Sequence, residues 1–221
     1  MKFDPHIHST YSGDAVNTPK EIIKKSKSLG LDIIAISDHN TVEGNKEARK
    51  LCKNEDLFVM PSIEISTKYG HILGLGVEER INKGLSPEET VDCIHEQGGL
   101  AIVPHPYCYY RNGLFCKYKN KNLNIDGVES KNARFILGYS NYMGKKLAKE
   151  KNIAEIGSSD AHYKEFIMDC YTEIDCEKDI DSILKAIKNR KTKALGKGTS
   201  NIKLSIFLFN KHIRKLYKNS N

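Results

Sequence analysis

The sequence predicts a single α/β domain whose parallel strands close, or nearly close, into a barrel. Short apolar runs typical of buried strands alternate with helix-like segments about seven times along the chain. Repeated strand–helix–strand units normally form right-handed parallel crossovers. A length of 221 residues, 39% of them hydrophobic, suits one domain that is long enough to close a barrel or to fill a layered core.

The first half of the chain alternates strand and helix from its start. Thr18-Pro19-Lys20-Glu21 begins a helix, because Thr18 suits the N-cap, Pro19 the first turn and Glu21 a capping box. That helix ends at Gly30. Asp-Ile-Ile-Ala-Ile-Ser then predicts a buried strand. The predicted elements of this half are strands at 3–6, 32–37, 57–63 and 72–77 and helices at 18–30 and 42–53.

The second half repeats the same signals. Ser86-Pro87-Glu88-Glu89 is a second Ser/Thr-Pro-x-Glu helix start, and Gly98-Gly99 ends that helix. A polar, aromatic loop is expected over residues 107–124. The remaining predicted elements are strands at 100–103, 126–129, 153–157 and 193–195 and helices at 134–151 and 180–191.

The net charge of +7 is concentrated at the C-terminus. From Lys197 onward the chain has six Lys or Arg residues and no Asp or Glu. We therefore divide the chain into a barrel at 1–199 and a basic tail at 200–221, which either packs on the barrel or extends from it to dock on RNA or a partner protein. There is no apolar run of about 18 residues and no leader-like start, so the expected location is the cytoplasm, without a membrane partner. The six cysteines form no CxxC pair and are expected to be reduced thiols.

Histidines and carboxylates stand where the predicted strands end. Neutral imidazole and carboxylate are ligands for Zn, Mn and Fe, and ten such groups exceed the three or four that one ion needs, so two or three ions are expected. In a parallel barrel the carboxyl ends of all strands open on one face, which would bring the groups together. The other histidines, His95 and His212, are expected to be ordinary. The set is His6, His8, His39, His71, His105 and His162, with Asp4, Asp38, Glu64 and Asp160.

Five of these motifs resemble those of the polymerase and histidinol phosphatase (PHP) family of metal-dependent phosphoesterases. The resemblance runs from residue 3 to about residue 196. It implies a distorted, TIM-like (β/α)7 barrel with a trinuclear metal site. The motifs are His6-Ile7-His8, Asp38-His39, the isolated Glu64, Pro104-His105-Pro106 and Ser159-Asp160-Ala161-His162.

The resemblance also implies which residues hold each ion. Asp14 follows Ser12-Gly13, where relatives more often read Ser-Asp-Gly, and His71 is assigned from its place at the start of a strand. Asp38 is expected to orient a metal-binding histidine or, alternatively, to cap the loop before Thr41. The implied ligands are His6, His8, Glu64 and Asp160 for the first ion, Glu64, His71 and His105 for the second, and Asp14, His39 and His162 for the third.

The predicted activity is hydrolysis of a phosphoric ester by attack of a metal-bridging hydroxide on phosphorus. Glu64 and Asp160 would hold the ions, and His162 could protonate the leaving group. Arg134, Arg111 and Asn132 are the expected substrate-binding residues, because guanidinium groups suit phosphate. No inserted lid is evident, which favours an open site.

For such a site we predict a nucleotide-type substrate, either a nucleoside bisphosphate or the end of a short RNA or DNA. The alternatives are a phosphatase for histidinol phosphate or another small molecule, a nucleic-acid-binding accessory module that uses the basic tail, and a degenerate barrel that binds metal without turnover.

Overall fold

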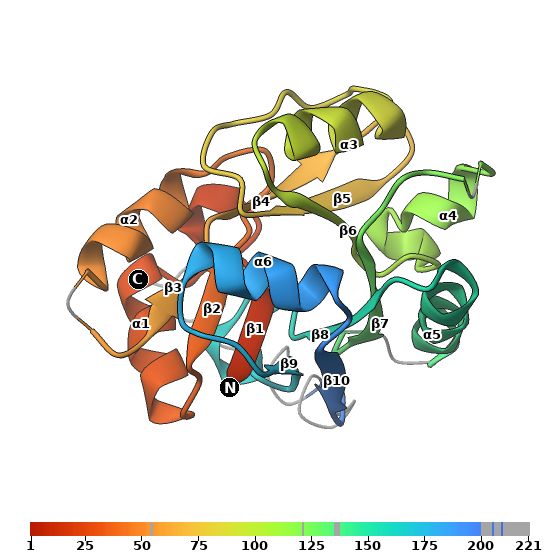
Figure 1. Ribbon diagram of the computed structural model, residues 1–221. Helices are drawn as coiled ribbons and strands as arrows, with labels where there is room; N and C mark the ends of the chain where they lie inside the picture. The colour runs from red at the N-terminus through yellow and green to blue at the C-terminus, as the bar shows by residue number, and fades with distance from the viewer. Residues whose placement is uncertain (54, 121, 135–137, 200–204, 206–208, 210–221) are drawn as a thin grey trace.

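The strands form two five-stranded sheets in the part of the chain that the structure, a computed structural model, describes (Figure 1). The described residues are 1–199 except 54, 121 and 135–137, together with 205 and 209. The predicted tail at 200–221, including His212, therefore lies almost entirely outside them. In spatial order the first sheet contains β10 (Thr192–Gly196), β9 (Cys170–Ile174), β1 (Lys2–Ile7), β2 (Ile33–Ile36) and β3 (Phe58–Val59); the second contains β4 (Ser62–Ser66), β5 (His71–Leu75), β6 (Leu100–Val103), β7 (Gly127–Asn132) and β8 (Ala154–Ser158).

The sheets are mixed, and the prediction that all strands are parallel is wrong. β1, β2 and β3 pair in parallel, as do β6, β7 and β8. β5 is antiparallel to both neighbours, and β9 is antiparallel to β1 and β10. The cause at β5 is a tight turn in which Thr67 N donates to Gly70 O at 2.8 Å, because so short a connection reverses the chain direction.

No continuous ladder joins the two sheets into a closed barrel within the described chain. The predicted strand 57–63 is divided between the sheets, since β3 ends at Val59 and β4 begins at Ser62. Pro61 lies at this break and has no backbone N–H to donate. At the other side the sheets touch through Gly157 N, which donates to Thr172 Oγ1 at 2.9 Å. The fold is therefore one mixed α/β domain, and the closed (β/α)7 expectation is not met.

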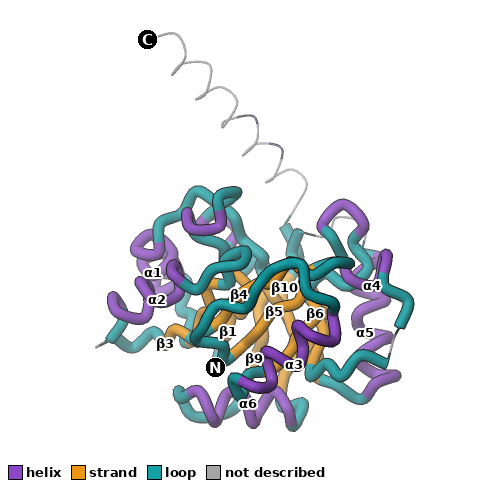
Figure 2. Tube along the Cα trace, turned by 90° about the horizontal axis from the view of Figure 1, so that it is seen from above, coloured by secondary structure: helices purple, strands orange, loops and turns teal. Residues whose placement is uncertain are grey.

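Helices surround the strands (Figure 2). Both predicted capping boxes are confirmed, at Thr18 with Glu21 and at Ser86 with Glu89. The predicted loop 107–124 contains two short helices. None of the described helices is long and apolar enough to cross a membrane. The helices are α1 (Pro19–Ser28), α2 (Glu43–Leu51), α3 (Pro87–Glu96), α4 (Leu114–Lys117), α5 (Tyr139–Lys151) and α6 (Ile180–Lys188), with 3-10 turns η1 (Thr10–Ser12), η2 (Tyr109–Arg111) and η3 (Lys164–Phe166).

The central core lies between the sheets. Phe3 and Ile33 from the first sheet pack with Leu73, Ile102 and Ile156 from the second, and all five are fully buried. Burying such side chains stabilises the fold by about 1.5–3 kcal/mol each. Because this apolar interior fills the space between the strands, the polar residues of the strand ends gather at one edge.

Candidate metal centre

The strand ends bring all nine predicted ligands to one place. His6 is in β1 and His8 follows it, His39 follows β2, and Glu64 lies within β4. His71 is the first residue of β5, and its arrival is explained by that strand's reversed direction, which puts its start at the edge where the parallel strands end. Asp14 follows η1, His105 follows β6, and Asp160 and His162 follow β8.

Glu64 occupies the middle of the centre and lies against five imidazoles. Its Oε2 is 3.3 Å from Nε2 of both His6 and His8. The same oxygen is 3.0 Å from Nδ1 of His39. Its Oε1 is 3.0 Å from Nδ1 of His71 and 3.2 Å from Nε2 of His105. A carboxylate whose two oxygens face different imidazoles is placed to bridge two cations.

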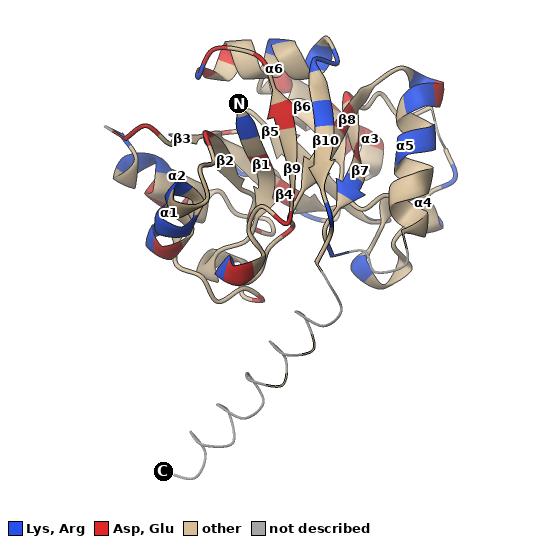
Figure 3. Ribbon diagram, turned by 90° about the horizontal axis from the view of Figure 1, so that it is seen from below, with Lys and Arg blue, Asp and Glu red and all other residues tan. Residues whose placement is uncertain are grey.

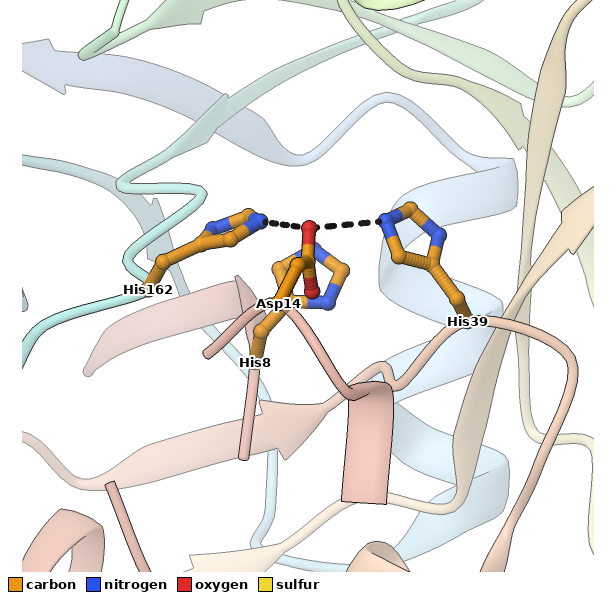
Figure 4. Close-up of side chains that lie close together, drawn as sticks. All are labelled: His8, Asp14, His39 and His162. Atoms are coloured by element: carbon orange, nitrogen blue, oxygen red, sulfur yellow. Dashed lines mark hydrogen bonds and ion pairs between the residues drawn. The ribbon is translucent and has the colours of Figure 1, made fainter. Parts of the chain in front are cut away.

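A second group lies at the mouth of the centre, where Asp14 stands between two histidines (Figure 4). Asp14 Oδ2 is 2.8 Å from Nε2 of His162 and 3.6 Å from Nε2 of His39. The His8 ring completes the group, with its centroid 4.2 Å from that of His162. The ligand atoms of these four residues all lie within 4.8 Å of one another.

The charges of the centre are strongly coupled. Burial opposes ionisation of Glu64, but His71, His6 and His39 hold its pKa well below the usual range. Burial also disfavours the charged form of His39, yet the Glu64 and Asp14 carboxylates raise its pKa to about 10. His162 differs, because burial and the neighbouring His8 lower its pKa to about 4. Carboxylates are thus ionised here, while protons compete for some imidazoles.

The residues present fit divalent transition metals. Buried atoms that make no hydrogen bond include His39 Nδ1, His71 Nδ1 and Glu64 Oε2. The His39 nitrogen faces Oε2 of Glu64, and the His71 nitrogen faces Oε1. Buried polar atoms are normally satisfied, and imidazole nitrogens and carboxylate oxygens without hydrogen bonds are the donors that Zn, Mn or Fe(II) would take. The ligand groups His6–His8–Glu64 and His39–Glu64–His71 share Glu64, as a polynuclear centre requires.

Glu129, which the strand-end pattern places at this face but which is not among the predicted ligands, orients two of them. Its Oε1 accepts a hydrogen bond from His6 Nδ1 at 2.8 Å, and its Oε2 accepts from the backbone N of His105 at 2.8 Å. Ser12 was not predicted: its Oγ lies 2.8 Å from Nδ1 of His8 and accepts from the backbone N of His39. The strand-end position of Glu129 was the available signal, whereas nothing in the sequence marked Ser12.

Asp38 does not contact a histidine in the predicted way. It accepts hydrogen bonds from the backbone N and the Oγ of Ser9, both at 2.6 Å. Asp38 therefore fixes the turn that follows His8 and supports the centre through the backbone.

Two of the predicted ligands adopt a strained backbone. His105 has φ of 31° and Asp160 has φ of 51°, in the left-handed region that non-glycine residues rarely occupy. Both stand directly after strands, where the chain must turn while the side chain stays directed into the centre. Such strain persists when surrounding contacts hold it, and it is common at functional sites.

The three predicted substrate-binding residues are placed differently. Arg111 makes a two-pronged ion pair with Asp160, at 2.8 Å and 2.5 Å. Arg134 Nη1 donates to His162 Nδ1 at 2.7 Å. The buried Asn132 donates from Nδ2 to Glu129 and Asp160, which suits positioning of these carboxylates better than contact with a substrate.

A cavity of about 510 Å³ opens over the centre, a size that suits a small ligand. Two arginines and three aromatic residues are among the side chains that line it. Lining residues include Asp14, His39, His71, Tyr110, Arg111, Arg134, His162, Tyr163, Phe166 and Thr199.

The chain is similar to several known proteins. The PHP domain family model matches residues 4–194. An uncharacterized Methanocaldococcus jannaschii protein is 45% identical over 146 residues, which are 60% of this chain and 82% of that protein. A 5'-3' exoribonuclease of Haemophilus influenzae is 34% identical over 105 residues, 46% of this chain and 38% of that enzyme.

A solved structure shares the fold. It is a two-domain protein from Bacteroides vulgatus that contains a predicted PHP-like metal-dependent phosphoesterase, with a TM-score of 0.71 and 18% identity. The match covers 89% of this chain and 64% of that protein, so the chain spans about two thirds of its length.

Proposed function

The chain belongs to the PHP domain family of metal-dependent phosphoesterases, and from that premise we propose that it hydrolyses nucleotide-type phosphate esters, either a nucleoside bisphosphate or the end of a short oligonucleotide. The observation that carries this proposal is the contact of Glu64 with five imidazoles beneath a cavity that two arginines face.

Divalent ions held by this ligand set, Mn, Zn or Fe and two or three in number, would supply an activated water and neutralise phosphate charge. Substrate binding and positioning of the ligands would fall to the residues of the chain. Arg134, and Arg111 where its pairing with Asp160 allows, would hold the phosphate oxygens. Glu129 and Asn132 would keep His6, His105 and Asp160 in position.

His162 is better suited to a ligand role than to protonation of the leaving group. Its pKa, lowered to about 4, leaves the imidazole neutral at pH 7, and a neutral imidazole binds metal but has no proton to spare beyond its ring N–H. We accordingly assign His162 to the Asp14–His39 group.

Nucleotide-type substrates are supported by the aromatic residues that line the cavity, Tyr110, Tyr163 and Phe166. Aromatic rings and guanidinium groups in one cavity suit a base together with a phosphate. The relative from Haemophilus influenzae, an exoribonuclease, points in the same direction. We also propose that residues 1–199 form the catalytic unit, because Thr199 is tied to the domain through Ala133 O and Asp169 Oδ2.

A phosphate-release screen tests this function. The protein, loaded with Mn, is offered nucleoside mono- and bisphosphates, short RNAs, sugar phosphates and histidinol phosphate. We expect the highest kcat/KM on a nucleotide, and a loss of several orders of magnitude in the His39→Ala and Asp160→Ala variants with little loss of folding. His95→Ala is the control, since His95 pairs with Asp126 away from the centre. Preference for histidinol phosphate, or near-normal turnover in His39→Ala, contradicts the proposal.

A further inference from the structure

Exposed tyrosines lie on two neighbouring elements, one of which borders the cavity. Within the described residues the four most exposed tyrosines are Tyr109, Tyr142, Tyr110 and Tyr139, at 74, 68, 62 and 58%. Two of them lie in η2, which follows the His105 loop, and two lie in the first turns of α5. Large aromatic side chains that gather on a surface mark an interaction site more often than scattered ones do.

The two elements that carry these tyrosines are in contact. The backbone N of Tyr107 donates to Ser140 Oγ on α5 at 3.1 Å. A Cβ placed on Gly144 would lie 3.3 Å from Cγ of Pro106, so the loop after His105 packs directly against the helix. Tyr110 itself lines the cavity over the metal centre. The loop that carries Tyr110 therefore joins the cavity to α5, and Tyr139 and Tyr142 lie on the exposed face of that helix.

Farther along α5 the exposed side chains change from aromatic to cationic. Tyr139, Tyr142, Lys146 and Lys149 follow the spacing i, i+3, i+7 and i+10, which places them in one stripe along the helix. From Tyr139 to Lys149 the helix advances by about 15 Å. The lysines of α5 are visible as blue segments in Figure 3.

The cationic end of this stripe borders a hollow of about 560 Å³. Four cations line it, Lys145, Lys146, Lys149 and Arg190, against one carboxylate, Glu155. Lys146 also lies 3.8 Å from Glu150, but both side chains are more than half exposed, so that pair is weak. The hollow is thus a net positive concavity at the far end of an aromatic stripe.

We propose that this surface binds a single-stranded nucleic acid whose terminal phosphate enters the metal centre. The surface consists of Tyr109, Tyr110, Tyr139, Tyr142, Lys146 and Lys149, and we refer to it as the α5 track. Unpaired bases stack on exposed tyrosines regardless of sequence, and lysines follow the phosphates. In a duplex the faces of the bases are stacked on one another, so a duplex would gain only the electrostatic contribution to the binding free energy. The inference rests on the proposed function, because it extends a nucleotide site to a longer chain.

Binding of a hydrolysis-resistant RNA tests the α5 track separately from turnover. The probe is a fluorescent, 5'-phosphorylated, phosphorothioate-linked single-stranded RNA of about twelve nucleotides, and its Kd is measured by anisotropy on the metal-loaded full chain. We expect Tyr139→Ser with Tyr142→Ser to weaken binding by at least about tenfold. Lys146→Ser with Lys149→Ser should lower the slope of log K against log salt by about 1.4. Turnover of a nucleoside bisphosphate should be unchanged in both variants.

Lys24→Ser with Lys27→Ser is the matched control, because these exposed lysines have the same spacing on α1, which lies on the side of the molecule opposite α5 (Figures 1 and 2). Wild-type affinity in the track variants overturns the proposal, as does a duplex RNA that competes as well as the single strand. Parallel loss of bisphosphate turnover in the tyrosine variant also overturns it, since the tyrosines would then belong to the cavity. If instead the wild type hydrolyses no ester but binds the probe through the α5 track, the proposed hydrolytic activity is contradicted and the proposed binding surface is supported.

Discussion

Oε1 of Glu129 lies 2.8 Å from Nδ1 of His6, and both side chains are fully buried. The carboxylate fixes the tautomer of the imidazole: Nδ1 carries the proton, and Nε2 is left to face Glu64 and Asp160. A carboxylate behind a metal-binding histidine raises the basicity of the ligand and holds the ring in orientation.

Glu129→Gln is therefore expected to weaken metal binding by about 10- to 100-fold. Glutamine keeps the size of the side chain but removes the charge and one acceptor oxygen, while His6 and His105 remain. Titration against a competing chelator measures the affinity. Glu173→Gln, an exposed change on β9, is the control, and equal affinity in the two variants would refute the orienting role of Glu129.

Gly44→Ala is expected to destabilise the protein, although alanine normally stabilises a helix by about 1 kcal/mol relative to glycine. A Cβ at this position of α2 would lie 2.1 Å from Oδ2 of Asp38 and 2.5 Å from Oγ of Ser9. Neither atom can yield easily, because Asp38 is held by two 2.6 Å hydrogen bonds from Ser9. Urea denaturation should show a loss of about 1–3 kcal/mol. Lys50→Ala, an exposed change in the same helix, should cause no loss of stability. A Gly44→Ala protein that is more stable than the wild type would show that the turn after His8 is free to move.

The elements with local signals were predictable from the sequence, and strand direction was not. Capping boxes are local, so the starts of α1 and α3 were found at the correct residues. The direction of β5 depends on the short turn at Thr67–Gly70, whereas the repeated strand–helix pattern predicted parallel strands throughout. β9 was missed although its burial alternates along Cys170–Ile174, because five residues of alternation are a weak signal beside the longer apolar runs.

The predicted ligands lie close together despite the error in strand direction, for a geometric reason. His71 was assigned from its place at the start of a strand, and reversal of that strand is what carries it to the edge where His6 and His105 stand. Positioning residues were harder to find. Glu129 and Ser12 act through contacts that only the folded chain creates. Glu129 and His6, for example, are 123 residues apart in the sequence.

Metal affinity should rise with pH. At neutral pH His39 is protonated, since its pKa is raised to about 10 by Glu64 and Asp14 against the effect of burial, and an ion can bind its nitrogen only after displacing that proton. The affinity for Mn or Zn should therefore increase by at least about tenfold per pH unit between pH 6 and 8. Calorimetry in buffers of different ionisation enthalpy measures the released proton. His95→Ala should keep this slope, and a pH-independent affinity would contradict the assignment of His39 as a ligand.

Arg134 offers the cleanest test of phosphate binding, because Arg111 is committed to Asp160 and its removal would leave a buried carboxylate unpaired. Arg134 is about one third exposed, faces the cavity and contacts His162. Loss of one charge-assisted contact costs about 1.5–3 kcal/mol, so Arg134→Ala should raise KM for a phosphate ester by at least about tenfold. Arg134→Lys should recover little of this loss, since an ammonium cannot form the two-pronged contact. Arg49→Ala, which breaks a surface pair with Glu78, should leave KM unchanged. An unaltered KM in Arg134→Ala would mean that the guanidinium orients His162 and does not hold the substrate.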